Sequence, residues 1–233
     1  MFKKNTNYLK HIIIILVVIA IIFAIIGIFG AKEAISDPRA KLIDEELIVN
    51  GFVSYFQDKV TKPQIYDDSP VLGDADAPVT IFEFSCFACP YSAEVQQILK
   101  QVMNKYHEQV KIVWKDLPMV EVYDDALLAH QAARCAGQQG KFWQYHDLLW
   151  QNQADFSIGN LSNLARVAGL NLADFETCLN GDEALFALKK DTDEANDLLI
   201  SGTPHFYINS QELLGAVKFE DFTRIINVEL NKK

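Results

Sequence analysis

The sequence predicts an α/β domain with a helical insertion, preceded by one N-terminal transmembrane helix. Three observations support this fold class. A strand–helix–strand pattern follows residue 78, a long stretch of helical periodicity occupies about residues 120–196, and two short strands and a helix complete the chain. Half of the 233 residues are hydrophobic, which is enough to form one substantial core.

The N-terminus has the composition of a membrane-spanning segment. Lys3, Lys4 and Lys10 precede residues 12–31, which contain no charged side chain. At about 1.5 Å per residue, a helix of this length crosses a hydrocarbon core of roughly 30 Å. We therefore expect residues 1–31 to form a cytoplasmic tip and a signal anchor. A cleaved signal peptide and a buried core helix are the alternatives.

The charge distribution predicts that the remainder of the chain lies outside the cytoplasm, on the periplasmic or cell-surface side. Lysines precede the apolar run, and all acidic residues follow it. The chain has 31 acidic and 21 basic residues, for a net charge of −10. Such a field disfavours nucleic acid and anionic lipid as partners. We expect a single-pass protein of the cell membrane with an extracytoplasmic C-terminal domain.

Residues 32–73 are expected to form a stalk or lead-in, and residues 74–233 the domain itself. Turn-forming residues separate the two parts. The domain then begins with an apolar, β-rich run at residues 79–84, which is typical of a central buried strand. A helix is expected at 91–106, and a second strand at 110–114. A strand–helix–strand unit of this length joins parallel strands.

The second half of the domain is expected to return to the sheet after the helical insertion. Gly202-Thr203-Pro204 leads into a strand at residues 205–208. A turn at 209–212 and a partner strand at 213–216 should follow, and a helix at 219–230 completes the chain. The two halves and the insertion are consistent with a single domain.

The segment from Val79 to Ser92 carries the clearest chemical signal. Cys89 stands where the first strand gives way to the helix, and Pro90 takes the first helical position, where its missing N–H costs nothing. A thiol at a helix N-terminus meets unpaired amides and the positive end of the helix dipole, which favour the thiolate. The thiolate is the form that attacks disulfides.

Four features together make the chain resemble the DsbA-like branch of the thioredoxin-fold oxidoreductases, over residues 73–230. They are the strand within 76–85, the motif Cys89-Pro90-Tyr91, the helical stretch 140–149, and Gly202-Thr203-Pro204 before an aromatic strand. The resemblance implies a thioredoxin fold with a helical insertion. It also implies exchange with thiols or disulfides of exported proteins, and a membrane-bound or soluble redox partner. No cofactor and no metal is implied.

The chain departs from this family at the redox motif. Ser92 occupies the place of the usual second cysteine, and Cys86 occupies the place of an aspartate. A second reading frame takes residues 86–89 as an ordinary C-x-x-C motif that starts the helix at Cys86. Pro90 would then be an interior helical residue, at a cost of about 3 kcal/mol. We therefore favour Cys89 as the nucleophile, with Cys86 as a possible resolving thiol.

Two polar residues near the cysteines are candidates for supporting roles. Glu83 is an acid in an apolar strand and resembles the family's buried, proton-relaying acid; a solvated edge position is the alternative. Lys115 is its possible charge partner. The Ser92 hydroxyl is a candidate donor to the Cys89 thiolate, or else a neutral residue of the first helical turn.

The remaining candidates follow from the resemblance and from the cysteine count. Thr203-Pro204 is expected to be a cis bond facing the nucleophile and, with Pro90 and Tyr91, to bind a substrate peptide. Cys135 and Cys178 form either a structural disulfide or two buried free thiols. The histidines of the insertion, His130 and His146, are expected to be core or surface residues rather than ligands, and His205 a surface residue.

The sequence thus predicts a membrane-anchored thiol–disulfide oxidoreductase, of the protein-disulfide oxidase or isomerase type. Two alternatives remain open. One is a monothiol isomerase or glutathione-linked reductase that uses Cys89 alone. The other is a redox-inactive thioredoxin-fold module that binds exported peptides.

Overall fold

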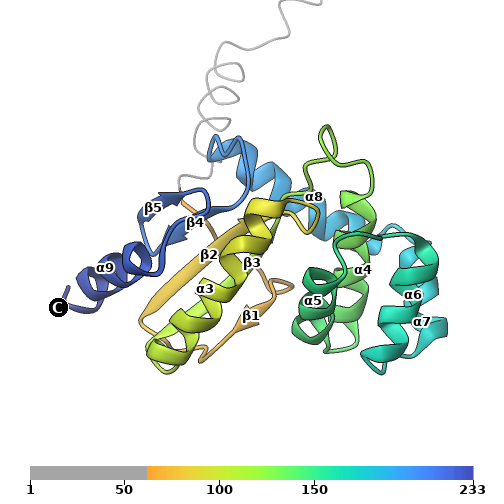
Figure 1. Ribbon diagram of the computed structural model, residues 1–233, viewed down its shortest axis with the longest axis horizontal. Coiled ribbons are helices and arrows are strands. Elements are labelled where there is room, and N and C mark those ends of the chain that lie inside the picture. The colour runs from red at the N-terminus through yellow and green to blue at the C-terminus, as the bar shows by residue number, and fades with distance from the viewer. Residues whose placement is uncertain (1–61, 233) are drawn as a thin grey trace, which may run out of the picture. The chain divides into compact units, whose positions relative to one another are not determined.

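A computed structural model describes residues 62–232 (Figure 1). The expected transmembrane segment at residues 12–31 and most of the lead-in lie outside the described residues. None of the helices within residues 62–232 combines the length and apolar character that a membrane span requires. The described part is one compact unit.

Five strands form a single sheet in the order β1-β3-β2-β4-β5. The parallel pair β2–β3 runs in register from Val79 opposite Val110 to Ser85 opposite Asp116, and the other three pairs are antiparallel. The strands are β1 (Val71–Leu72), β2 (Val79–Ser85), β3 (Val110–Asp116), β4 (His205–Ile208) and β5 (Gln211–Leu214). The predicted parallel strand–helix–strand unit is confirmed.

Within residues 62–232, seven helices follow the order that the sequence predicts. The helices are α3 (Pro90–Tyr106), α4 (Ala126–Gln138), α5 (Phe142–Gln151), α6 (Ile158–Val167), α7 (Leu172–Leu179), α8 (Glu183–Asp197) and α9 (Phe219–Leu230). Helices α4–α7 form a separate layer beside the sheet (Figure 1). The α/β fold with a helical insertion is therefore confirmed.

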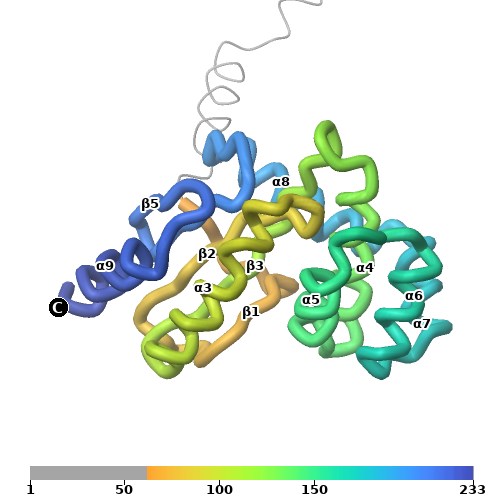
Figure 2. The backbone as a smooth tube through the Cα atoms, in the orientation of Figure 1, coloured from red at the N-terminus to blue at the C-terminus, as the bar shows by residue number. Residues whose placement is uncertain are grey.

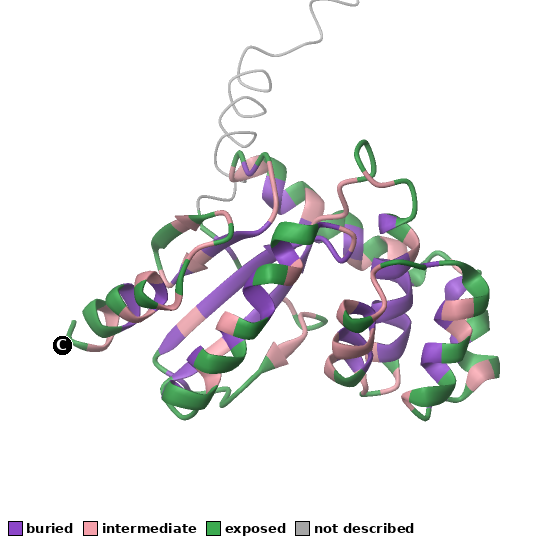
Figure 3. Ribbon diagram, in the orientation of Figure 1, coloured by how far each residue is buried: buried purple, intermediate pink, exposed green. Residues whose placement is uncertain are grey.

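Each face of the sheet is covered by apolar side chains. On one face α3 and α9 pack together over β2, β3 and β4, burying Ile81, Leu99 and Phe222 among others. On the opposite face α8 contacts β3. A smaller apolar cluster, which includes Phe84, Val113 and Ala195, is buried there. The central strands are buried almost throughout (Figure 3). This burial explains why β2 and β3 have nearly continuous apolar sequences.

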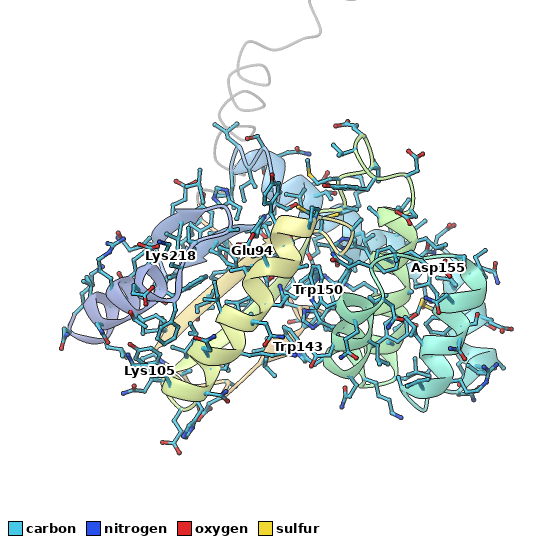
Figure 4. All side chains as sticks on the ribbon, viewed as in Figure 1. Glu94, Lys105, Trp143, Trp150, Asp155 and Lys218 are labelled. Carbon is cyan, nitrogen blue, oxygen red and sulfur yellow. A yellow bond between two sulfur atoms is a disulfide. The ribbon has the colours of Figure 1, made fainter. Side chains whose placement is uncertain are left out.

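The helical insertion has its own core, and a disulfide crosses it. Phe142, Tyr145 and Leu149 of α5 pack against small residues of α4. Cys135 of α4 is bonded to Cys178 of α7, with a Cα–Cα distance of 5.7 Å. Of the two expected alternatives for these cysteines, the structure has the disulfide. Figure 4 shows Trp143 and Trp150 on the side of the insertion that is turned toward α3.

Two boundaries differ from the sequence expectation. The sheet begins at Val71, within the stretch assigned to the lead-in, because β1 adds an edge strand to β3. Strand β5 begins two residues earlier than expected, since Asn209 adopts a positive φ of 52° and closes a two-residue turn. Gln211 and Glu212 resemble turn residues in the sequence, but β5 is an exposed edge strand, where polar side chains are tolerated.

The disulfide closes a loop with a sequence separation of 43 residues, so its removal should lower the stability of the domain. For Cys135→Ala with Cys178→Ala we expect the free energy of unfolding to fall by roughly 2–4 kcal/mol, measured by urea denaturation. Each single variant should cost about as much as the double variant, because either one removes the crosslink. A double variant as stable as the unaltered protein would contradict this assignment.

Candidate active site

The two remaining cysteines lie in the short link between β2 and α3, and both are free thiols. The Cys89 N–H donates to the Cys86 carbonyl oxygen at 3.0 Å, which closes a four-residue turn. Turns of this kind hold their end Cα atoms within about 7 Å, the upper limit for a disulfide. Both cysteines belong to one apolar cluster that also contains Met119, Tyr123 and Ala126. The link lies beside the segment that leads from β3 to α4 (Figure 2).

Cys89 is the N-cap residue of α3, and Pro90 follows in the first helical position. Helix α3 thus starts at Cys89 and not at Cys86, in agreement with the favoured interpretation of the motif. No side chain caps this helix end, so its first N–H groups are directed toward the region of the Cys89 sulfur. Cys89 is 4% exposed, whereas Cys86 is completely buried. Of the two cysteines, Cys89 is therefore the one that keeps contact with solvent.

The loop before β4 faces this cysteine. The Thr203–Pro204 bond is cis, as expected, and the Cys89 thiol donates to the Thr203 carbonyl oxygen at 3.5 Å. On the solvent side of the site, Pro90 and Tyr91 are exposed, with Tyr91 63% exposed. Among the sequence candidates, these four residues are therefore gathered around one sulfur.

Ser92 contacts the other cysteine. Its side chain is completely buried, and its hydroxyl oxygen accepts the N–H of Cys86 at 3.5 Å. The expected hydrogen bond to Cys89 is not among the contacts of the described residues. Ser92 instead helps to fix the backbone of the link from inside the first turn of α3.

Glu83 is buried in the middle of β2, as expected. Its carboxylate accepts a hydrogen bond of 2.7 Å from Gln96 Nε2, which also donates to the Ser92 carbonyl oxygen at 3.2 Å. Burial raises the pKa of Glu83 to about 7, against the smaller opposing effect of the Gln96 hydrogen bond. The carboxyl group also lines a cavity of about 270 Å³ between α3 and α5.

The predicted contact between Glu83 and Lys115 is wrong. Glu83 is paired with Trp114 in the sheet, so Lys115 points to the opposite face. There its ammonium group is fully buried and pairs with Asp191 at 3.0 Å and with Glu194 at 2.7 Å. Lys115 is thus part of a charge network beneath α8 and has no direct role at the thiols.

A buried histidine lies against Cys86, and the sequence analysis did not place it at the site. His130 Nδ1 is 2.6 Å from Asp116 Oδ1, and Nε2 accepts the N–H of Phe87 at 3.2 Å. The ring thus contacts the backbone of the residue next to Cys86, close enough to influence the pKa of that thiol. His130 was expected in the core or on the surface; it lies in the core, beside the link that contains Cys86.

The pKa shifts of Cys86, His130 and Asp116 each favour the charged form of the side chain. Burial would raise the pKa of Cys86, but the hydrogen bond and charge of His130 outweigh it and lower the pKa. Burial likewise opposes a charged His130, yet Asp116 and Cys86 raise its pKa to about 9. Asp116 is buried as well, but Arg134 and His130 hold the pKa of its carboxyl far below the usual range.

Two further contacts at the site were not found from the sequence. Tyr123 packs against the two cysteines, and Gln153 Nε2 donates to the Phe87 carbonyl oxygen at 2.6 Å. Their distance along the chain from residues 86–92 hides them from motif analysis. His205 is 6% exposed rather than a surface residue, because β4 is inside the sheet, where the side chain stacks on Tyr207.

Two curated relatives match the domain over similar lengths. The chain is 32% identical over 154 residues to "Na(+)/H(+) antiporter NhaA 1" of Salinispora arenicola, covering 66% of this chain and 24% of the relative. It is 28% identical over 153 residues to a "putative protein-disulfide oxidoreductase" of Rickettsia felis, covering 63% of this chain and 55% of the relative. The chain thus spans about a quarter of the length of the first relative and about half of the second.

The fold is shared with a solved structure. Oxidised BdbD from Bacillus subtilis superimposes with a TM-score of 0.67 at 24% identity, covering 74% of this chain and 98% of BdbD. A family model described as "Thioredoxin" matches residues 66–228, from just before β1 into the last helix. Because this match covers well over half of the chain, and its two motif loops meet at Cys89, the protein belongs to the thioredoxin family, with the DsbA-like form of the fold.

Proposed function

We propose that this protein is a membrane-anchored, extracytoplasmic thiol–disulfide oxidoreductase that acts on exported proteins. The observation that carries the proposal is the position of the Cys89 sulfur, at the start of α3 and 3.5 Å from the Thr203 carbonyl oxygen. A helix N-terminus has unpaired backbone N–H groups beside this position. The relative described as a protein-disulfide oxidoreductase supports the same chemistry.

Because Cys89 is the more exposed of the two cysteines, we assign it the attack on the substrate and assign Cys86 the resolving step. The Cys89 thiolate attacks one sulfur of a substrate disulfide, forming a mixed disulfide and releasing the other substrate sulfur as a thiolate, which takes a proton from water. The Cys86 thiolate then attacks Cys89 Sγ, so that a Cys86–Cys89 bond forms and the second substrate thiolate leaves. The substrate gains two electrons and the protein loses them. The reverse sequence oxidises a substrate dithiol.

Peptide binding is assigned to the surface around Cys89. The carbonyl group of Thr203 is directed at the site, and an extended peptide could pair with the backbone beside Pro204. The exposed Tyr91 ring offers apolar contact area on the other side of the sulfur. A protein substrate that binds along this surface needs no deep pocket.

The proposed location is supported by two features. The uncharged run at residues 12–31 is long enough to anchor the chain in a membrane. The Cys135–Cys178 disulfide indicates an oxidising compartment, because such bonds are rare in the cytosol.

Glu83 is proposed to exchange protons with the site during turnover. With a pKa of about 7, its carboxyl group can both take up and release a proton near neutral pH. Gln96 connects it to the first turn of α3, and the adjoining cavity gives room for water.

Cys89→Ala should abolish disulfide exchange, because it removes the sulfur that substrates can reach. Insulin reduction in the presence of a thiol reductant measures this. The Cys135→Ala and Cys178→Ala double variant, assayed below its unfolding temperature, should retain activity and serves as the cysteine-removal control. Unchanged activity of Cys89→Ala would refute the assignment of the nucleophile.

Cys86→Ala should preserve the first attack but prevent resolution. We expect mixed disulfides with a substrate peptide to accumulate, visible as a stable adduct on a non-reducing gel or by intact mass. The unaltered protein should show at most a transient adduct under the same conditions. Equal turnover by the variant and the unaltered protein would support the monothiol alternative.

Glu83→Gln should change how stability depends on pH. Unfolded Glu83 ionises near pH 4.5 and the folded residue near pH 7, so the folded state loses stability as pH rises through this window. The loss is absent below pH 4.5 and complete above pH 7, where it amounts to roughly 3 kcal/mol. The variant, whose side chain does not ionise, should lack this component in urea denaturation at several pH values. Identical pH profiles for both proteins would contradict the buried, weakly acidic carboxyl.

A further inference from the structure

We propose that the cavity between α3 and α5 is a binding site for a compact organic cation, which has an ammonium or amidinium group on an apolar body and pairs its charged end with Glu83. The inference goes beyond the proposed function, because it concerns a small ligand and not the disulfide substrate. It rests on the size, the walls and the charges of the cavity.

The first argument is the space and its apolar walls. The cavity has a volume of about 270 Å³. Since an apolar cavity of roughly 150 Å³ already holds a benzene ring, this one has room for a substituted ring or a branched alkyl group. Its walls include Leu99 and Met103 from α3, Ile112 from β3 and Trp143 from α5. Trp143 lies on the side of the insertion that is turned toward α3 (Figure 4).

The second argument is the acid at the inner end of the cavity. Glu83 is 1% exposed, and Gln96 Nε2 donates to its Oε1 atom at 2.7 Å. A carboxylate has two oxygens and about four acceptor positions, so one amide donor leaves capacity for a second donor. An ammonium or amidinium group has charged N–H donors, which form the stronger kind of hydrogen bond with a carboxylate.

The third argument is the charge at the rim. Lys100 and Asn104 are exposed and Asp147 is half-buried, so these residues form the outer part of the lining. Lys100 Nζ pairs with Asp147 Oδ2 at 3.2 Å and joins α3 to α5 there. Within the described residues, this lysine is the one permanent cation that lines the cavity, and Asp147 already matches its charge. An anionic ligand would therefore meet the Glu83 carboxylate without a free positive partner, whereas a cation is attracted.

His146 is the remaining titratable group of the lining. Its Nε2 accepts the indole N–H of Trp150 at 2.9 Å, and its Nδ1 lies 3.1 Å from Asp147 Oδ1. Burial lowers the pKa of His146, against the smaller opposing effect of Asp147, and so favours the neutral imidazole. Glu83 is thus the group of the lining whose charge changes near neutral pH.

These charges determine how binding depends on pH. With a pKa of about 7, Glu83 is ionised in about a tenth of the molecules at pH 6 and in about nine tenths at pH 8. A cation that binds the ionised form should therefore bind about tenfold more tightly at pH 8 than at pH 6. A neutral ligand that accepts a hydrogen bond from protonated Glu83 should show the opposite trend.

The test compares benzamidine, which is a cation at both pH values, with benzamide, its neutral counterpart of nearly the same size. The indole N–H of Trp143 donates to the Val71 carbonyl oxygen at 2.9 Å, and its NMR signal reports on the wall of the cavity. Titrations of the full-length chain in detergent micelles at pH 6 and pH 8 give a dissociation constant for each ligand from the movement of this signal.

Benzamidine should move the Trp143 signal, with a dissociation constant about tenfold lower at pH 8 than at pH 6. At pH 8 it should bind about tenfold more tightly than benzamide, because its hydrogen bond to the carboxylate is charge-assisted. The inference would be overturned by an unmoved signal with benzamidine at pH 8, by an affinity that does not change with pH, or by benzamide binding as tightly at pH 8.

Two matched variants locate the cation within the cavity. Glu83→Gln should weaken benzamidine binding about tenfold at pH 8 and remove its dependence on pH. The control is Asp147→Asn, which also converts a carboxylate of the lining into an amide, but at the rim. The hydrogen bond with His146 and the charge of Lys100 lower the pKa of Asp147, so this control should keep the tenfold difference between pH 6 and pH 8. The reverse pattern in the two variants would contradict the pairing with Glu83.

A second measurement needs no variant. The carboxyl carbon shift of Glu83 is followed by NMR against pH, with and without saturating benzamidine. Because coupling between the proton and the cation is reciprocal, bound benzamidine should lower the pKa of Glu83 from about 7 to about 6 or below. An unchanged titration with the ligand bound would refute the proposed site. None of these measurements requires disulfide exchange, so their failure would leave the assignment of the cysteines standing.

Discussion

The N-terminus of α3 is the feature on which the site depends. Strand β2 ends at Ser85, a single turn follows, and the helix begins at Pro90, so the backbone itself fixes Cys89 at a helix end. The parallel pairing of β2 with β3 and the antiparallel pairing with β4 then bring two distant segments to this junction. The Thr203 loop comes from one side and Asp116 from the other. The chemistry follows from strand order as much as from the motif.

The site combines two kinds of buried charge. Glu83 has one neutral amide partner and lies beside a cavity, so burial governs its pKa. Asp116 is surrounded by donors and stays ionised. This difference suits separate tasks, because a group that titrates near pH 7 can carry protons, whereas a permanent anion can only orient and stabilise a cation.

The sequence predicted most of the fold because its signals are local. The apolar run of β2, the helical spacing after Pro90 and the glycine-containing turns all report on neighbours along the chain. The Glu83–Lys115 contact was wrong because the face to which a strand residue points depends on register. His130 was not placed at the site because its contact with the link between β2 and α3 arises only when α4 packs beside that link. A contact between residues that lie more than 40 positions apart produces no spacing pattern in the sequence.

The most direct test of this account is the pairing of the cysteines after mild oxidation. The full-length chain would be oxidised, treated with an alkylating label, digested without reduction and examined by mass spectrometry. We expect the peptide that contains both Cys86 and Cys89 to have lost two hydrogens and to carry no label, with Cys135 still joined to Cys178. A labelled Cys86 in the oxidised protein, or a bond from Cys89 to either cysteine of the insertion, would contradict the proposed pairing of nucleophile and resolving thiol.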